Sequence, residues 1–260
     1  MGKIKPISHE DELSLIEHLD ELRTRLIVLL LAFLVVGGLC FWQNNAILEI
    51  VNAPLPPEMI PSTFGVSEAF MSTLTVSLYA ALIIVSPLLV YEVYAFVVPA
   101  FSDQEKRVAR PLVVVAPLLF VAGSAFGYFV VLPAALNFLL GFNAEEFNML
   151  LRARDYYSFF GMTVLSMGAL FELPLAILVA ARLGFVTPHQ LRTNRRYAVL
   201  IIAVVAMLLP GTDPITMLIS MVPLLVLFEI SIWLTVWFGS PSNAISQSSD
   251  LAKSSEAAKA

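Results

Sequence analysis

The chain has 260 residues, a formal net charge of −5, 58% hydrophobic residues and only 13% charged residues. Soluble globular domains contain about 45–50% apolar and about 25% charged residues, so this composition indicates a protein built for a lipid bilayer. Its single cysteine, Cys40, excludes an internal disulfide and a thiolate metal cluster. The acidic balance does not indicate a face that binds nucleic acid.

Charge-poor stretches of roughly 17–25 residues, the length that crosses about 30 Å of hydrocarbon, recur along the chain. We expect six membrane segments, at residues 26–42, 70–98, 111–138, 156–181, 197–209 and 215–238. The fifth is short, at about 13 residues or near 20 Å of helix. It spans only if the bilayer thins locally or flanking arginines snorkel outward, and a half-inserted helical hairpin is the alternative.

The N-terminal region has the pattern of a helix that leads into the first membrane segment. Ser14 and Glu17 match a capping box. Leucines at helical spacing lie near one face: Leu15, Leu19, Leu22 and Leu26. We expect residues 1–21 to form a cytoplasmic acidic helix, residues 22–239 a six-helix transmembrane domain, and the Ser/Ala/Lys-rich residues 240–260 a disordered cytoplasmic tail.

The placement of lysine and arginine predicts the orientation. Thirteen of the fifteen fall on one side of the expected membrane: Lys3, Lys5, Arg23, Arg25, Lys106, Arg107, Arg110, Arg182, Arg192, Arg195, Arg196, Lys253 and Lys259. Only Arg152 and Arg154 fall on the other side. The positive-inside rule therefore predicts a multi-pass protein of the inner (cytoplasmic) cell membrane with both termini in the cytoplasm.

The loops and prolines add local expectations. Asp213 is expected to cap the sixth segment, with Pro214 at its first position. A cap signature at residues 187–190 predicts a short helix before the fifth segment. Prolines are expected to kink most of the long helices: Pro87, Pro117, Pro133, Pro174 and Pro223.

Two acids near the inner surface, Glu21 and Glu105, are candidates for binding a cation. Glu21 has a structural explanation as an i,i+4 ion pair with Arg25. Residues 10–25 nevertheless hold six acids against two arginines, so local pairing cannot neutralise this stretch. Glu105 matches a capping box with Ser102, but a capping Glu stays at the surface and capping does not preclude binding.

Three more acids, Glu92, Glu172 and Glu229, lie inside apolar runs. A charge at the bilayer centre costs on the order of 3 kcal/mol on insertion scales, so such an acid is a functional candidate by default. Glu92 is close to the inner end of its segment, and we interpret it as structural. Glu172 and Glu229 are expected to share one depth, and the alternative is that each carboxyl is protonated and bonded to a neighbouring helix.

The motifs of zinc proteases, G-x-S-x-G hydrolases and P-loop nucleotide-binding proteins are absent. The three histidines, His9, His18 and His189, fall in the expected cytoplasmic segments, so none can serve a serine inside the membrane. Neither an enzyme nor a cofactor or metal site is therefore expected.

At these residues the chain resembles the TatC family, the largest membrane subunit of the twin-arginine protein translocase. The similarity runs from about residue 18 to residue 238 and rests on the order and spacing of several short motifs. They are His18-Leu19-x-Glu21-Leu22-Arg23-x-Arg25-Leu26, Ala53-Pro54-Leu55, Tyr91-Glu92-Val93-Tyr94-Ala95-Phe96, Pro99-Ala100 with Glu105, Phe171-Glu172-Leu173-Pro174, the turn at Asp213, and Phe228-Glu229.

The resemblance implies an all-α polytopic membrane fold, in which six transmembrane helices, several of them kinked by proline, form a concave, glove-like bundle. It implies a core receptor that binds twin-arginine signal peptides of folded precursor proteins at its cytoplasmic face. The implied partners are TatA- and TatB-type single-helix subunits, other TatC copies and membrane lipid. The implied energy source is the proton-motive force.

By motif match, Glu21 and Glu105 are implied to receive the two arginines of the signal peptide. Arg23 and Phe96 are implied to lie in the same recognition patch. Where the family often has Gln, this chain has Met217, and Phe101 stands where Leu is frequent.

The remaining implied roles lie deeper in the membrane and on the outer side. Glu172 is implied to be a polar group of the concave face that meets the single-helix subunits, and Glu229 is a second intramembrane candidate. Pro54 and Asp213 are implied to shape the outer side.

Two other classes of function remain open at this point. One is a secondary transporter of a small cation that uses Glu172 and Glu229. The absence of an internal repeat and of a membrane-embedded basic residue counts against it. The other is a structural scaffold in which Glu21 and Glu105 tolerate neutral substitution.

Overall fold

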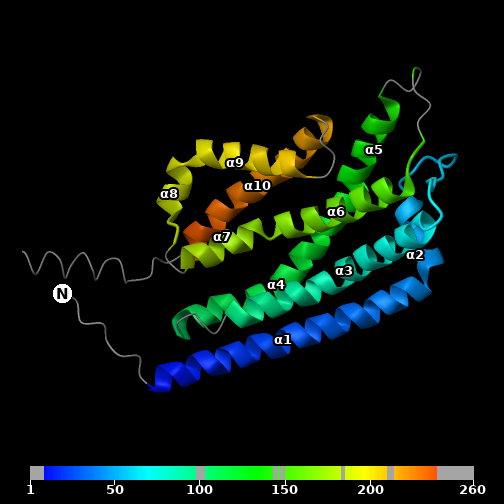
Figure 1. Cartoon of the computed structure of the whole chain (residues 1–260). Helices are drawn as coiled ribbons and strands as arrows, with labels where there is room; N and C mark the ends of the chain where they lie inside the picture. Colours follow the sequence, from blue (N-terminus) through cyan, green and yellow to red (C-terminus); the bar gives the residue numbers. More distant parts are fainter. Residues whose placement is uncertain are drawn as a thin grey trace, which may run out of the picture.

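A computed structural model describes residues 9–97, 103–142, 146, 150–182, 185–209 and 214–238, and their side chains except those of residues 9–17, 103–110 and 238. Within these residues the chain is helical, apart from loops and one isolated bridge. The helices lie side by side in an elongated array, with α1 at one edge and α9 at the opposite edge (Figure 1). The predicted all-α polytopic fold is confirmed.

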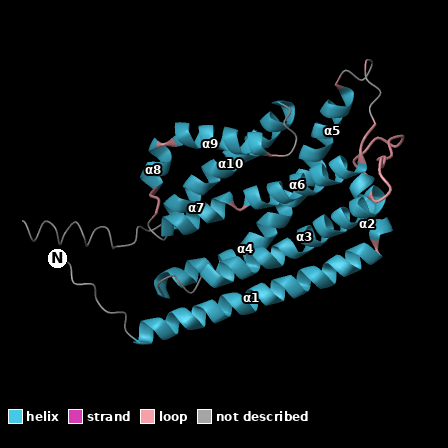
Figure 2. Ribbon diagram, in the orientation of Figure 1, coloured by secondary structure: helices cyan, strands magenta, loops and turns pink. Residues whose placement is uncertain are grey.

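Figure 2 shows the same view coloured by secondary structure. In chain order the elements are α1 (His9–Trp42), α2 (Asn44–Asn52), α3 (Glu68–Val97), α4 (Asp103–Phe126), a π-helical turn (Gly127–Val131), α5 (Leu132–Gly141), α6 (Ala153–Phe171), α7 (Leu173–Arg182), α8 (Pro188–Thr193), α9 (Arg195–Leu208) and α10 (Pro214–Phe238).

The array has two ends. At one end, called the α8 end below, α1, α4 and α9 begin, α3 and α7 end, and α8 lies between α7 and α9 (Figure 1). At the other, the α2 end, α2 follows α1 and α6 begins (Figure 1). The two arginines that the sequence assigns to the opposite side, Arg152 and Arg154, lie at the α2 end, at the start of α6.

Five stretches of the described chain are long and apolar enough to cross a bilayer: His18–Trp42, Glu68–Val97, Pro111–Gly141, Ala153–Arg182 and Pro214–Trp237. The fifth expected segment corresponds to α9, whose 14 residues give about 21 Å of helix. Because hydrocarbon is about 30 Å thick, α9 is short, as predicted. That it spans the membrane stays a prediction.

The observed helix starts can be compared with the capping boxes predicted from the sequence. The capping box before α8 is confirmed, since the N–H of Gln190 donates to Oγ1 of Thr187 at 3.2 Å and the N–H of Thr187 donates to Oε1 of Gln190 at 2.9 Å. The capping box at Ser14 does not start a helix, because α1 runs unbroken from His9. The predicted boundary after residue 21 therefore falls inside α1.

Further predictions concern the ends of α4 and α10. Helix α10 begins at Pro214, as predicted. Asp213, Ser102 and the predicted tail after residue 239 lie outside the described residues.

Two of the expected long helices are interrupted next to a proline. A π-helical turn precedes Pro133 in α5, and Glu172 separates α6 from α7 just before Pro174. A proline has no N–H and removes one i→i−4 hydrogen bond, which a local change of helical winding accommodates. Helix runs through the other three predicted kink sites, Pro87, Pro117 and Pro223.

Helices α4 and α6 approach each other closely through glycines. A methyl group built on Gly123 of α4 would lie 2.6 Å from the backbone oxygen of Met167 in α6. One built on Gly161 of α6 would lie 2.2 Å from the ring of Tyr79 in α3. Small residues let backbones approach where packing, rather than the hydrophobic effect, joins helices in lipid. These contacts hold α3, α4 and α6 together as the centre of the array.

An ion pair ties the loop after α2 to the start of α6. Glu68, buried at the start of α3, accepts hydrogen bonds from Nε of Arg152 at 2.6 Å and from the N–H of Phe64 at 2.9 Å. The hydrogen-bonded carboxylate of Glu68 raises the pKa of the Arg152 guanidinium. Ser62 bridges the same segment through the N–H of Ala153, at 2.9 Å. Pro54 lies in the turn at the beginning of this loop.

We expect Gly123→Ala to destabilise the protein by about 1–3 kcal/mol, the usual cost of overpacking, because the new methyl meets a backbone atom that no side-chain rotation can move. Thermal unfolding of the purified protein in detergent measures this. Gly38→Ala in α1 is the matched control, since no atom lies within 4 Å of its added methyl. Equal melting temperatures for the two variants would contradict the close approach of α4 and α6.

Candidate functional site

Polar side chains of α1 and α3 face each other at the α8 end. Glu21 and Arg25 are four residues apart on α1, and Glu92 and Phe96 are four residues apart on α3. Residues at this spacing share one face of a helix. Because α1 packs against α3, these two faces form a single site.

Arg25 joins the two helices. Its Nη2 lies 2.5 Å from Oε1 of Glu21, its Nε also donates to that oxygen, at 3.2 Å, and its Nη1 contacts Oε2 of Glu92. The side chains of Glu21, Arg25 and Glu92 are 38%, 23% and 16% exposed. One guanidinium therefore bridges two partly buried carboxylates that belong to different helices.

Phe96 lies beside this ion-pair network. Its ring stacks on that of His18, with centroids 4.1 Å apart and planes within 9°. Nδ1 of His18 in turn lies 3.5 Å from Oε2 of Glu21. The structure thus places the predicted site residues Glu21 and Phe96 together, with His18 between them.

A recess of about 510 Å³ opens between these helices, lined by Asp20, Glu21, Thr24, Arg25, Val28 and Glu92. We call it the acidic recess. It contains three carboxylates against one guanidinium, so Arg25 does not neutralise it. An arrangement of this kind attracts a cationic group to the end of the molecule where most of the arginines of the chain lie.

The leucine stripe of α1 faces away from α3. Leu19, Leu22 and Leu26 are 63%, 44% and 64% exposed, while Arg25 is turned toward Glu92 of α3. In a bilayer, apolar side chains face lipid at no cost and polar ones need protein partners. The helical spacing of these leucines, seen in the sequence, therefore marks the outward face of α1.

The other two residues of the predicted recognition patch, Arg23 and Glu105, lie at the same end. Arg23 is exposed on α1. Glu105 is the third residue of α4, which packs against α3, but its side chain lies outside the described part of the structure. A contact between Glu105 and the acidic recess therefore stays a prediction.

Glu172 occupies the break between α6 and α7, deeper in the array. Both of its carboxylate oxygens are buried. Tyr94 of α3 is near enough to interact electrostatically with this carboxyl, and neither carboxylate oxygen accepts a hydrogen bond within the described residues. Pro174 follows two residues later and is the second residue of α7. The sequence predicts an acid within an apolar run and a proline kink here, and the structure has a break between two helices at Glu172.

Glu229 has a different partner. Its Oε2 accepts a hydrogen bond from Nη2 of Arg195, at the start of α9, at 3.0 Å, and both side chains are about half exposed. The structure thus pairs Glu229 with a base at the α8 end, whereas Tyr94 accompanies Glu172. The prediction that these two acids act together gains no support from their contacts.

Sequence reasoning interprets Glu92 as structural and does not predict its contact with Arg25. The available signal was the position of Arg25, directly before the first apolar run, together with the i,i+4 spacing of Glu92 and Phe96, which puts both on one helix face. His18 lies one helical turn before Glu21 and was not predicted to be a site residue.

These features define a multi-pass helical membrane protein with an acidic recess at one membrane surface. Residues 17–223 match the family described as Sec-independent protein translocase protein (TatC). Relatives include the TatC proteins of Aquifex aeolicus, 37% identical and covering 85% of this chain and 93% of the relative, and of Escherichia coli K12, 33% identical and covering 89% and 92%.

The fold agrees with this match. A crystal structure of the twin arginine translocase receptor TatC has a TM-score of 0.73 and 36% identity, and the match covers 86% of this chain and 100% of that one. The chain therefore belongs to the TatC family of Sec-independent protein translocase proteins, which are translocase components rather than enzymes.

The bridge between α1 and α3 predicts energetic coupling between Arg25 and Glu92. A double-mutant cycle of Arg25→Gln and Glu92→Gln, read as the stability change on thermal unfolding in detergent, should give an interaction energy of about 0.5–3 kcal/mol. The exposed pair Arg195 and Glu229 is the control and should give about 0.2–1 kcal/mol. Additive effects at Arg25 and Glu92 would mean that the bridge does not form in solution.

Proposed function

We propose that this chain is the core receptor subunit of a twin-arginine translocase and binds twin-arginine signal peptides of folded precursors at its α8 end. The observation that carries this proposal is the acidic recess between α1 and α3. We assign the α8 end and both termini to the cytoplasm of a cell that holds the protein in its inner membrane, because most of the lysines and arginines fall on that side.

The chemistry of the recess suits arginine. A guanidinium keeps its charge at any physiological pH and donates two parallel hydrogen bonds to one carboxylate, whereas a lysine ammonium is a strongly hydrated point charge. Two carboxylates held at fixed positions on rigid helices therefore select a pair of guanidinium groups over a pair of ammonium groups. In this proposal Glu21 receives one arginine and Glu105 receives the other.

Arg25 leaves Glu21 able to bind. An ionised carboxylate offers about four lone-pair sites, and Arg25 occupies one oxygen of Glu21 while His18 lies near the other. The stacked rings of His18 and Phe96 add a flat surface, on which a guanidinium plane packs favourably. Arg23, exposed on α1, lies where it can contact the acidic or polar residues that flank the arginines of a signal peptide.

The apolar stretch of the signal peptide then lies along lipid-facing helix surface. We further propose that Glu172 and Glu229 meet the TatA- and TatB-type single-helix subunits, that Pro54 and Asp213 shape the outer side, and that other copies of this chain complete the assembly. The proton-motive force supplies the energy, since the sequence holds no nucleotide-binding motif. The break at Glu172 supports its role, because it holds a buried carboxyl between two helices.

We expect Glu21→Ala or Glu105→Ala to abolish crosslinking of a twin-arginine precursor while the complex stays assembled. Each substitution removes one of the two carboxylates that hold the guanidinium groups. Photocrosslinking from positions next to these residues, with blue-native electrophoresis to follow assembly, measures both effects.

A precursor with two lysines is the control ligand and should crosslink weakly to the unmodified chain. Glu49→Gln, an exposed acid of α2 at the opposite end, is the control variant and should crosslink normally. Unchanged crosslinking in both the Glu21 and Glu105 variants would overturn the proposal and favour the scaffold interpretation.

Arg25 gives a second prediction, which concerns the selectivity for arginine over lysine in the signal peptide. Arg25→Gln removes the internal counter-charge and leaves three carboxylates unopposed in the acidic recess. Electrostatic attraction then holds any cation, so the ratio of twin-arginine to twin-lysine crosslinking should fall several-fold, chiefly because the lysine precursor binds better. Arg154→Gln, at the α2 end, should leave the ratio unchanged. A ratio that rises in Arg25→Gln would show that Arg25 does not compete for the carboxylates.

A further inference from the structure

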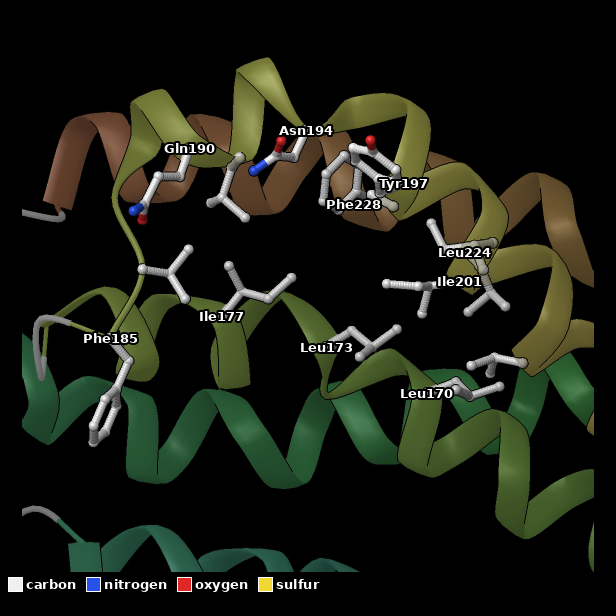
Figure 3. Close-up of a pocket in the computed structure, with 15 residues that line it drawn as sticks. Leu170, Leu173, Ile177, Phe185, Gln190, Asn194, Tyr197, Ile201, Leu224 and Phe228 are labelled. Atoms are coloured by element: carbon white, nitrogen blue, oxygen red, sulfur yellow. The ribbon is translucent and has the colours of Figure 1, made fainter.

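A second cavity lies at the opposite edge of the array, away from the acidic recess. It is a crevice of about 680 Å³ between α7 and α9, with α10 behind it (Figure 3). Its walls are apolar over most of their length: Leu173 and Ile177 from α7, Ile201 from α9, and Leu224 and Phe228 from α10. We call it the α7–α9 crevice.

The crevice is polar at one end only. Gln190 and Asn194 lie near the end occupied by Phe185, while Leu170 and Leu224 lie at the other (Figure 3). Because α9 begins at the α8 end, the polar end is at the membrane surface and the apolar end points into the bilayer. This is the polarity of a lipid molecule in one leaflet.

The surroundings of the polar end are basic. Arg196 lies 4.9 Å above the ring of Tyr197, which lines the crevice, and donates to its hydroxyl at 3.3 Å. Arg192 is exposed on α8, and Arg195 is paired with Glu229. In the described parts of α7 to α10, Glu229 is the only acid, so the mouth carries an excess of positive charge that an anionic group would complement.

The shape of the crevice suits a thin apolar occupant. From Asn194 to Val205 the lining extends about 17 Å along α9. Apolar walls also exclude water. The occupant that fits is a thin apolar chain with an anionic head.

We propose that the α7–α9 crevice binds one anionic phospholipid, with an acyl chain between α7 and α9 and its phosphate at Arg196 and Tyr197. Basic pockets between membrane helices bind anionic head groups in this way. The site goes beyond the proposed signal-peptide receptor function and stands independently of it.

Another apolar cavity of the molecule supplies an internal comparison. It has a volume of about 360 Å³, lies near the α2 end and is lined by residues that include Ile50, Ala80, Val121 and Phe160. Neither cavity has an arginine or lysine among its lining residues, but Arg196 contacts Tyr197, which lines the α7–α9 crevice. A lipid held in the comparison cavity by hydrophobic contact alone has no reason to prefer an anionic head group.

Native mass spectrometry of the purified protein, with dioleoyl phosphatidylglycerol or dioleoyl phosphatidylcholine added in detergent, tests the proposal. The unmodified chain should retain one phosphatidylglycerol in preference to phosphatidylcholine. Arg196→Gln should reduce that preference about five-fold, and Ala198→Phe, which fills the crevice, should abolish retention. Two control variants should change neither the preference for phosphatidylglycerol nor its retention: Arg154→Gln, and Ala80→Phe, which fills the comparison cavity.

Labelling of the unmodified chain makes the test independent of how the variants fold. Phosphatidylglycerol with a photoreactive acyl chain should label peptides of α7 and α9. Labelling confined to other helices, or a preference unchanged in Arg196→Gln, would overturn the proposal. So would loss of labelling at α7 and α9 when single-helix subunits are co-expressed, because the crevice would then belong to a protein partner.

Discussion

An arginine held at the membrane surface between two helices requires counter-charges from both, and this requirement organises the α8 end of the molecule. Arg25 meets it with Glu21 from its own helix and Glu92 from α3. Breaking such a partly buried pair leaves an uncompensated charge, which costs far more than the pair itself contributes. The bridge therefore fixes the rotation of α1 about its axis: Glu21 and Arg25 face α3, and Leu19, Leu22 and Leu26 face outward.

Because α1 lies at the edge of the array, the site between α1 and α3 stays accessible. Of the long helices, α1 packs mainly against α3, so much of its surface stays open to an incoming chain. The centre of the array is different, because glycines let α4 and α6 approach closely. A tightly packed centre with an open edge is consistent with the receptor function proposed above.

The sequence predicted well whatever depends on local physics. Apolar run length predicted the five long apolar helices and the short length of α9, and the Thr187–Gln190 capping box predicted the start of α8. It failed where a residue depends on a partner far along the chain. Glu92 lies 67 residues from Arg25, and no periodicity in either segment specifies that the two meet. The capping signal at Ser14 did not mark a helix start, because α1 already runs through that residue.

The last turns of α3 connect the two acidic features of the molecule. Glu92 and Tyr94 are two residues apart, or about 200° around the helix axis, so they project from nearly opposite faces. Glu92 meets Arg25 of α1, while Tyr94 interacts with the buried Glu172 between α6 and α7. Any tilt or rotation of this short segment changes both contacts together, because a helix turns as a rigid body over two turns. The acidic recess at the surface and the buried carboxyl deeper in the array thus share one structural element, although no contact joins them directly in the described part of the chain.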